Sequence, residues 1–203
     1  HKSLRGSDVQ GSLYYMARAL EAGEDPMTLF RRAIAMAAED IGLADPRALQ
    51  LAVAARDAFH MLGVPEGYLP LSEMVIYLAS APKSNRTKVA LDAAFEAARR
   101  TPNAPVPVHL RNPVTTLHRG LGYGRDYRYA HDEPIGIAPQ QHLPDAVRGE
   151  VYYEPSPFGH EREIAKRLAW WAERLTRDTD AVLAPEQVPD VGAPVRRDDG
   201  ADV

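Results

Sequence analysis

The chain has 203 residues, of which 45% are hydrophobic and 26% are charged, and this balance excludes disordered, fibrous and membrane-spanning classes of protein. It contains no cysteine, no signal sequence and no apolar run of the ~18 residues that a membrane helix needs, so we expect a cytoplasmic globular protein without disulfides. The net charge of −4 comes from the end of the chain, where seven acids and two arginines after residue 177 give −5. The rest is close to neutral and its charge indicates no particular partner.

Apolar residues recur at helical spacing through the first half of the chain and predict five helices. Asp8 offers an N-cap for the first helix, and Asp45 followed by Pro46 offers a start for the third. The apolar run at residues 74–79 fits a buried strand or a buried helix, and its helical neighbours favour the helix. The predicted helices cover residues 8–22, 27–42, 45–62, 70–81 and 83–100.

The pattern changes after residue 100. Prolines impose extended backbone on residues 102–107, and the density of Gly, Pro, Tyr and His in residues 108–153 is typical of ordered loops, with one short helix capped by Asn112. A last helix is expected over residues 156–176, and residues 179–203 lack periodicity and are expected to be disordered. The prediction is an all-α helical bundle with one long irregular loop region.

Motifs for nucleotide chemistry and nucleophilic catalysis are missing from the sequence. The phosphate loop G-x-x-x-x-G-K-[ST] does not occur, and Gly120, Gly122 and Gly124 lack the strand before and the helix after that such a loop requires. No serine lies in a G-x-S-x-G setting. Because the chain starts at His1 and enters a helical pattern almost at once, we also expect an upstream portion to be missing. The chain itself is predicted to be no enzyme and to bind no cofactor.

Seven histidines raise the question of a metal site. His131 followed by Asp132 is similar to the dipeptide of HD-type metal phosphohydrolases, in which such ligands hold a divalent ion, and His109, His118 and His142 are conceivable further ligands. The companion histidine and distant aspartate on helices are not evident, and isolated histidines more often donate hydrogen bonds or cap helices. We predict no metal site, and a metal hydrolase is a remote alternative.

Residues 106–132, called the Arg/Tyr loop below, interleave arginines with tyrosines and contain a single acid, Asp126, before Asp132. Guanidinium groups pair with phosphates and tyrosines stack on unpaired bases, so this loop is a candidate surface for nucleic acid or a protein partner. Alternatively, the tyrosines fix the loop to the bundle while the arginines cap helix ends and bridge to acids such as Asp132. The candidate binding residues are Arg111, Arg119, Tyr123, Arg125, Tyr127 and Arg128.

Trp170 and Trp171 cannot both face the core of one helix, because adjacent residues point about 100° apart. One of them should contact another surface, either a neighbouring subunit or a loop of the same chain. Together with Ile76, from the apolar run at residues 74–79, they are the candidate residues of an oligomer interface.

Seven segments carry a family resemblance, in their order along the chain. They are HKSLRGSD (1–8), AAEDIGLADPRAL (37–49), LASAPKSN (78–85), VPVHLRN (106–112), LGYGRDYRYAHD (121–132), QQHLPD (140–145) and YYEPSPFGHE (152–161). The chain resembles the C-terminal region of the replication-associated recombination protein A family, also called MgsA or RarA, a group of clamp-loader-related AAA+ ATPases. The resemblance spans nearly everything except the tail.

The resemblance implies that residues 1–22 continue from the AAA+ lid, that residues 23–178 form a helical oligomerisation domain similar to a clamp-loader collar, and that residues 179–203 are an acidic tail. It implies a homotetramer, with ATP and Mg²⁺ in a missing AAA+ core. It also implies DNA-dependent ATP hydrolysis at stalled replication forks, single-stranded DNA and single-stranded DNA-binding protein as partners, and association with the nucleoid. The expected function of this chain is assembly, with docking of DNA or protein by the Arg/Tyr loop as the alternative.

Overall fold

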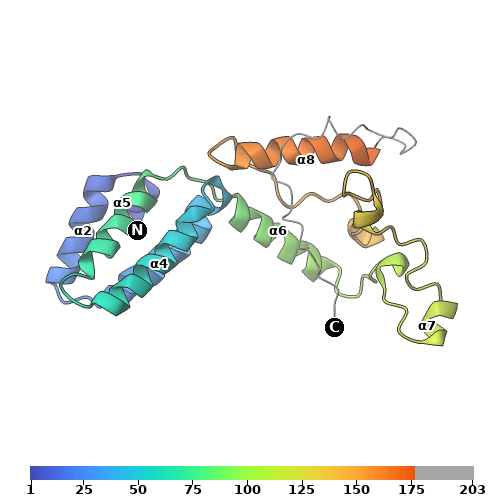
Figure 1. Ribbon diagram of the computed structural model, residues 1–203, viewed down its shortest axis with the longest axis horizontal. Helices are drawn as coiled ribbons and strands as arrows, with labels where there is room; N and C mark the ends of the chain where they lie inside the picture. Colours follow the sequence, from blue (N-terminus) through green and yellow to red (C-terminus); the bar gives the residue numbers. More distant parts are fainter. Residues whose placement is uncertain (177–203) are drawn as a thin grey trace, which may run out of the picture. The chain divides into compact units, whose positions relative to one another are not determined.

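The computed structural model describes residues 1–176, and this part of the chain is all helical without a strand, as the sequence predicts (Figure 1). It forms two compact units: the first contains His1–Asn103 and Gly149–Ala165, and the second contains Ala104–Arg148 and, among the described residues, residues 166–176. No helix within residues 1–176 is long and apolar enough to cross a membrane. The predicted disorder of residues 179–203 concerns a segment outside the described residues.

Six α-helices precede residue 103, and their caps explain where they begin. Asp8 accepts a hydrogen bond from the backbone N–H of Gly11 at 2.8 Å, and Asp25 accepts one from Met27 at 2.9 Å. The first helix is a single turn, too short for periodicity to reveal. The helices are α1 (Lys2–Arg5), α2 (Val9–Glu21), α3 (Pro26–Met36), α4 (Arg47–Leu62), α5 (Tyr68–Ser80) and α6 (Arg86–Arg100).

The core of the first unit lies where α5 packs against α4 and α2, with α3 beside α4 (Figure 1). The apolar run at residues 74–79 is part of α5 and is therefore helical, as its neighbours indicate. Met74 and Leu78 are fully buried on this helix, and burying such a side chain stabilises the fold by about 1.5–3 kcal/mol. The largest fully buried apolar side chains are Phe30, Met36, Ile41, Leu71, Met74 and Leu78.

The predicted helix over residues 27–42 is interrupted. Regular α3 ends at Met36, a π-helical turn follows at Ala37–Ile41, and a 3₁₀ turn follows at Gly42–Ala44. Gly42 has φ of +52°, and a Cβ there would come within 2.9 Å of the Thr87 hydroxyl oxygen. The backbone at Gly42 therefore lies close to the first turn of α6, where only glycine fits.

The second unit consists mostly of turns, in agreement with the predicted loop region. Its short helix begins after Thr115, whose hydroxyl accepts a hydrogen bond from the N–H of His118, so the predicted cap at Asn112 is wrong. Its elements are the 3₁₀ turns Val108–Leu110, Ala130–Asp132 and Asp145–Val147, the helix α7 (Thr116–Gly120), and α8 (Glu161–Thr176), which begins in the first unit.

The helix α8 starts at Glu161 and not at residue 156 as predicted. The carboxylate of Glu161 accepts the backbone N–H of Ser156 at 3.0 Å, which folds the intervening residues into a loop. A side chain that satisfies a backbone group from outside the helix thus moves the helix start by five residues.

Candidate functional site in the Arg/Tyr loop

The backbone of the Arg/Tyr loop is fixed by hydrogen bonds within the second unit. Gln140 clamps Arg128, since its side-chain oxygen accepts the Arg128 N–H at 3.1 Å and its amide nitrogen donates to the Arg128 carbonyl at 2.8 Å. His109 Nε2 lies 2.7 Å from the carbonyl oxygen of Gln141, and the N–H of Gly124 donates to the Val108 carbonyl at 3.1 Å. Three of the family-like segments, at residues 106–112, 121–132 and 140–145, are thereby joined to one another.

Two of the predicted site residues, Arg111 and Tyr123, contact each other within the loop. The Arg111 guanidinium carbon lies 5.1 Å from the centroid of the Tyr123 ring, and Arg111 Nη1 donates to the Tyr123 hydroxyl at 3.2 Å. The His118 ring stacks on Tyr123 at 4.9 Å with an interplanar angle of 13°. Both candidates therefore hold the loop together in this conformation.

A third candidate, Arg128, forms a bidentate ion pair with Glu133, with both N–O distances at 2.8 Å. The sequence suggested acids such as Asp132 as partners, but Asp132 lies in a 3₁₀ turn one residue before the acid that Arg128 contacts. The Glu133 side chain is 14% exposed, so this pair is partly shielded from solvent. The charge of Arg128 is therefore already compensated by Glu133.

The remaining candidates, Arg119, Arg125 and Tyr127, are exposed to solvent. Within residues 1–176, neither Arg119 nor Arg125 has an acid or a hydrogen-bond acceptor at its guanidinium group. Arg125 lines an open depression of about 450 Å³, together with Val108 and Leu121. This volume lies within the range of small-ligand sites, roughly 300–1,000 Å³. The arrangement can bind an anionic group beside an apolar one.

The glycines of the loop do not form a phosphate cradle. The N–H of Gly122 donates to the Arg119 carbonyl at 3.0 Å, and the N–H of Gly124 donates to Val108. A phosphate loop needs free backbone N–H groups that point toward the ligand, whereas these are already occupied. The second unit therefore does not fit the triphosphate of ATP at this position.

The histidines considered as metal ligands lie in separate environments. His118 stacks on Tyr123, His109 contacts the Gln141 carbonyl, and the His131 ring lies 5.0 Å from the Tyr129 ring. Within residues 1–176 no three histidine or acidic side chains come together as a metal-binding group.

The predicted interface residues lie on two helices. Ile76 is 44% exposed on α5, while Trp170 and Trp171 are both half-buried on α8. The Arg174 guanidinium lies 3.9 Å from the Trp170 ring centroid and its Nη1 donates to the Trp170 carbonyl at 3.3 Å, so this ring already has a partner within its own helix.

Sequence reasoning missed a more exposed apolar cluster at the connection of α4 and α5. Four apolar side chains within nine residues are more than half exposed. The sequence could have indicated this cluster, because apolar residues stand on both sides of the turn at residues 63–67. We call this cluster the α4–α5 tip, which consists of Met61, Leu62, Val64 and Leu69. Adjacent exposed apolar side chains of this kind mark interaction surfaces.

Five polar side chains besides Ser12 are buried in the first unit, and we call them the buried polar hub. Its backbone joins distant segments, because the N–H of Ser84 donates to the Asp40 carbonyl at 2.8 Å and the N–H of His160 donates to the Ala44 carbonyl at 2.8 Å. The hub residues are Asp40, Asp45, Ser84, Ser156 and Glu161. Three more family-like segments, at residues 37–49, 78–85 and 152–161, thus meet in the first unit.

Two carboxylates of the hub, Glu161 and Asp45, have pKa values that hydrogen-bond donors lower. Burial alone would raise the pKa of Glu161, but hydrogen bonds from Ser156, Ser84 and Tyr153 outweigh it and leave the pKa below its ordinary value of 4.5. The pKa of Tyr153 is raised by burial and by its 2.9 Å hydrogen bond to Glu161.

The same balance applies at Asp45. Burial would raise its pKa, whereas hydrogen bonds from Tyr77 at 2.5 Å and from Arg47 at 3.1 Å lower it below the ordinary 3.8. The carboxylates of Glu161 and Asp45 are buried and accept hydrogen bonds from these donors, so we assign them a structural role.

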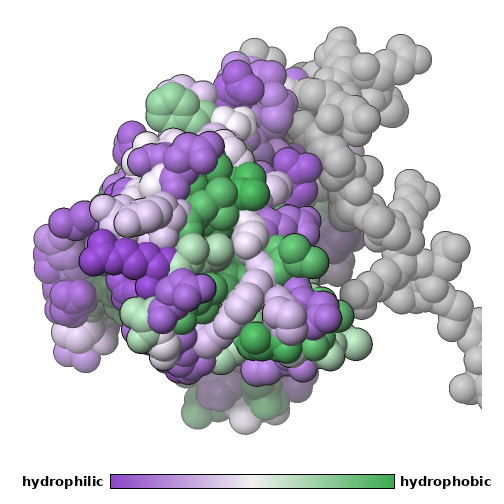
Figure 2. All heavy atoms as spheres, turned by 90° about the vertical axis from the view of Figure 1, so that its left-hand side faces the viewer, coloured by the Kyte–Doolittle hydropathy of each residue, from purple (hydrophilic) through white to green (hydrophobic). Residues whose placement is uncertain are grey.

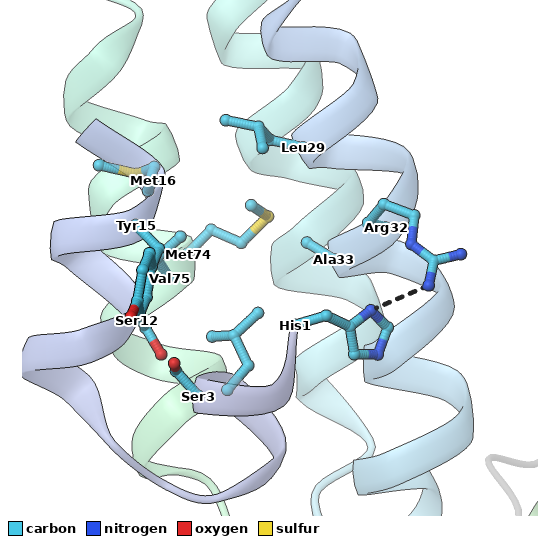
Figure 3. A pocket seen from close by; sticks show the side chains of 11 residues that line it. His1, Ser3, Ser12, Tyr15, Met16, Leu29, Arg32, Ala33, Met74 and Val75 are labelled. Carbon is cyan, nitrogen blue, oxygen red and sulfur yellow. Dashed lines mark hydrogen bonds between the residues drawn. The ribbon is translucent and has the colours of Figure 1, made fainter. Parts of the chain in front are cut away.

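A second concavity, in the first unit, is small and largely apolar (Figure 3). Met16, Leu29 and Met74 line it, and Arg32 Nη2 lies 3.3 Å from His1 Nδ1 beside it. Its volume of about 110 Å³ is below that of typical ligand sites, and we assign it no ligand.

Comparison with known proteins places these features in a family. The family described as the C terminal of the MgsA AAA+ ATPase matches residues 6–172. Replication-associated recombination protein A of Escherichia coli K12 is 46% identical over 175 residues, which are 86% of this chain and 39% of that protein. The proteins of the same name from Coxiella burnetii and Bacillus subtilis are 47% and 38% identical over 84% and 82% of this chain, and over 39% of their own length in both cases.

The chain thus spans about 39% of the length of these curated relatives. The matched residues contain the hub and the whole Arg/Tyr loop, so the segments that join within each unit are those that carry the resemblance. The chain belongs to the MgsA (replication-associated recombination protein A) family of AAA+ ATPases and corresponds to their C-terminal part.

Proposed function

We propose that this chain is an assembly module, which joins copies of a DNA-dependent AAA+ ATPase into a homotetramer that acts at stalled forks in replication, recombination and repair. AAA+ proteins hydrolyse ATP at the boundaries between subunits. A domain that fixes the number and spacing of subunits therefore determines which ATP sites can form. Membership in the MgsA family supports the AAA+ part of this proposal.

The observation that carries the proposal is the exposure of apolar side chains in the first unit. At the α4–α5 tip, Met61 is 88% exposed and Leu69 is 72% exposed. Figure 2 looks onto the end of this unit and shows hydrophobic side chains in green among polar side chains in purple. A symmetric interface uses the same patch on both partners, and such a patch must lie outside the monomer core.

Ile76 supports the same role, because it is the exposed member of an otherwise buried run on α5. Trp170 and Trp171 are weaker candidates for the interface, because both are already half-buried and Trp170 contacts Arg174. We therefore place the α4–α5 tip and Ile76 before the two tryptophans in the proposed interface.

Light scattering on the chain tests the proposal. We expect a solution mass near four times the 22.4 kDa of one chain. The double variant Met61→Asp with Leu69→Asp should lower the tetramer fraction at least tenfold, because charges would be buried at the interface. Val151→Asp, at an equally exposed apolar residue of the same unit, is the matched control and should leave the mass unchanged. A wild-type mass of one chain at high concentration would overturn the proposal.

The proposal extends to the parent protein. Residues 1–22 would continue from the AAA+ lid and residues 23–178 would form the assembly domain, whose last two residues lie outside the described part of the chain. ATP and Mg²⁺ would bind in the AAA+ portion of the full-length protein, which would act in the cytoplasm near the nucleoid. Fork DNA, single-stranded DNA and single-stranded DNA-binding protein would be partners of that full-length protein.

A second function, docking of nucleic acid or a protein by the Arg/Tyr loop, is favoured by Arg119 and Arg125. Both guanidinium groups are exposed and, within residues 1–176, lack an acidic partner. They can therefore bind phosphates or carboxylates without breaking an existing ion pair. This role can coexist with assembly because it uses residues of the second unit.

The docking function predicts salt-dependent binding of a single-stranded oligonucleotide. Replacing Arg119 and Arg125 together by Ala should reduce the slope of log K against log salt by about 1.4, which corresponds to two lost phosphate contacts. Arg18→Ala with Arg31→Ala, two exposed arginines of the first unit, should leave the slope unchanged. No binding by the wild type at low salt would remove this function.

A further inference from the structure

We propose that the acidic segment at residues 178–203 of this chain docks onto the Arg/Tyr loop of the same chain, on a surface formed by Arg119, Arg125, Leu117 and Leu121. The occupant is thus a named part of the protein itself. Its docking does not require either function proposed above, whereas its regulatory consequence rests on the docking function of the loop.

The two arginines belong to one compact turn. The N–H of Gly122 donates to the Arg119 carbonyl at 3.0 Å, and the N–H of Arg125 donates to the Gly122 carbonyl at 3.1 Å. These successive i to i+3 hydrogen bonds hold both residues on the same short stretch of backbone. Both positive charges are therefore carried by one short, hydrogen-bonded stretch of backbone, with the acid Asp126 next to Arg125.

These charges are the exception within the loop. Arg128 is paired with Glu133, and Arg111 is engaged by Tyr123 and by the Val106 carbonyl at 2.7 Å. Arg119 and Arg125 are left without such partners inside the described part of the chain. The two unpaired guanidinium groups are therefore available to an anionic ligand.

The surface beside these arginines is aliphatic. Leu117 is 70% exposed, and Leu121, which is 58% exposed, lines the same depression as Arg125. Single-stranded nucleic acid prefers aromatic rings on which bases can stack. Tyr123 is already engaged by Arg111 and His118, and the exposed rings of Tyr127 and Tyr129 do not line the depression. A peptide that carries both carboxylates and branched apolar side chains fits this surface better than bases do.

Residues 178–203 have this composition. They contain seven acids and two arginines, a charge of −5, and they also contain five valines and one leucine. The acids are Asp178, Asp180, Glu186, Asp190, Asp198, Asp199 and Asp202. The family model matches residues 6–172 and does not cover this acidic segment.

The tether makes docking possible even if each contact is weak. The segment begins two residues after the last residue of α8, Thr176, and residues 166–176 of this helix belong to the same unit as the loop. Chains of about 25 residues span roughly 25–30 Å on average and provide effective concentrations near the millimolar range. Docking would occupy the anion-binding surface, and an external anionic ligand would have to displace the segment.

A distance measurement on the full chain tests the proposal. Because the chain has no cysteine, nitroxide labels can be attached at introduced Thr116→Cys and Ala201→Cys. We expect a short distance population at low salt that broadens in 1 M NaCl. Replacing Arg119 and Arg125 by Ala should lower the ratio of docked to free segment about tenfold, as expected for two ion pairs at a solvent-exposed surface. The matched control, Arg18→Ala with Arg31→Ala, should retain the short population.

Three outcomes would overturn the proposal. The first is that no short label-to-label distance is found at low salt. The second is that the short distance persists in the variant without Arg119 and Arg125. The third is that the short distance vanishes when labelled chain is diluted with excess unlabelled chain, which would show docking between copies. An oligonucleotide that binds at these arginines without changing the distances would also contradict it. Light scattering on the same samples reports assembly separately, so a failure of the tetramer and a failure of docking give different results.

Discussion

The buried polar hub and the Arg/Tyr loop both contain charged side chains, but these are buried and hydrogen-bonded in the hub and partly exposed and unpaired in the loop. In the hub, Glu161 and Asp45 lie out of contact with solvent and each accepts hydrogen bonds from several donors. In the loop, Arg119 and Arg125 are exposed and have no acidic partner within residues 1–176. The same family match covers both regions. Resemblance to a family therefore does not separate residues that hold the fold from residues that are available to bind.

The largest expected effect is at Glu161. Replacing it by Ala leaves the Tyr153 hydroxyl and the Ser156 N–H without their acceptor inside the fold, and we expect a loss of about 4 kcal/mol in the free energy of unfolding. Urea denaturation measures this loss. Glu154→Ala, at an exposed acid of the same segment, is the control and should cost less than about 0.5 kcal/mol. Equal costs for the two variants would remove the contrast between hub and loop.

A second test concerns the close approach of Gly159 to Ala44. A Cβ at Gly159 would lie 2.0 Å from the Ala44 carbonyl oxygen, and φ is +51°, so Gly159→Ala should cost about 3 kcal/mol in urea denaturation. Gly149→Ala separates the two causes, because Gly149 has φ of +81° but no atom within 4 Å of the added Cβ. We expect a cost of only about 1 kcal/mol there. A larger cost at Gly149 than at Gly159 would contradict the packing of the hub.

The hub also predicts how stability depends on pH. Folding lowers the pKa of Glu161 and of Asp45, so their stabilisation is complete above the ordinary values of 4.5 and 3.8 and is lost as the pH falls through the lower folded values. The thermal midpoint should therefore drop between pH 5 and pH 3. Glu161→Gln should show a lower midpoint at pH 7 and a shallower drop. An identical drop in wild type and variant would show that Glu161 is not a source of the dependence.

The smallest effects on stability are expected in the loop. Arg128→Ala breaks the pair with Glu133 and should cost about 1 kcal/mol, since the pair is partly shielded. Arg119→Ala should change stability by less than about 0.5 kcal/mol, because no contact inside the described chain is lost. Thermal unfolding of both variants measures the difference. If Arg119→Ala proved the more destabilising, the arginine would belong to the scaffold.

Much of the fold could be predicted because helix formation is a local property. Asp8 and the spacing of apolar residues predicted both ends of α2 to within one residue. The helical neighbours of the apolar run at residues 74–79 correctly indicated that it is helical, as part of α5. The start of α8 was missed because Glu161 satisfies the N–H of Ser156, a contact that periodicity does not contain. The π-helical turn after α3 was also missed, and the close approach of Gly42 to Thr87 that follows it is a distant contact that periodicity does not contain.

The candidate site was predictable in composition but not in detail. The sequence identified the arginines and tyrosines of the loop, whereas it could not tell that Arg111 and Tyr123 contact each other across eleven intervening residues or that Arg128 pairs with Glu133 and not with Asp132. The α4–α5 tip was missed because the exposure of Met61 depends on where α5 turns back against α4. Pairing and exposure are properties of the folded chain.

The clamp between Gln140 and Arg128 has a practical consequence for any ligand of the loop. Its two hydrogen bonds join a neutral amide to the backbone, and such bonds are not weakened by dissolved ions. Ion pairs at Arg119 and Arg125 would be screened at the same ionic strength. A charged ligand could therefore be eluted with salt while the surface that held it keeps its shape, and the loop would be ready to bind again once the salt is removed.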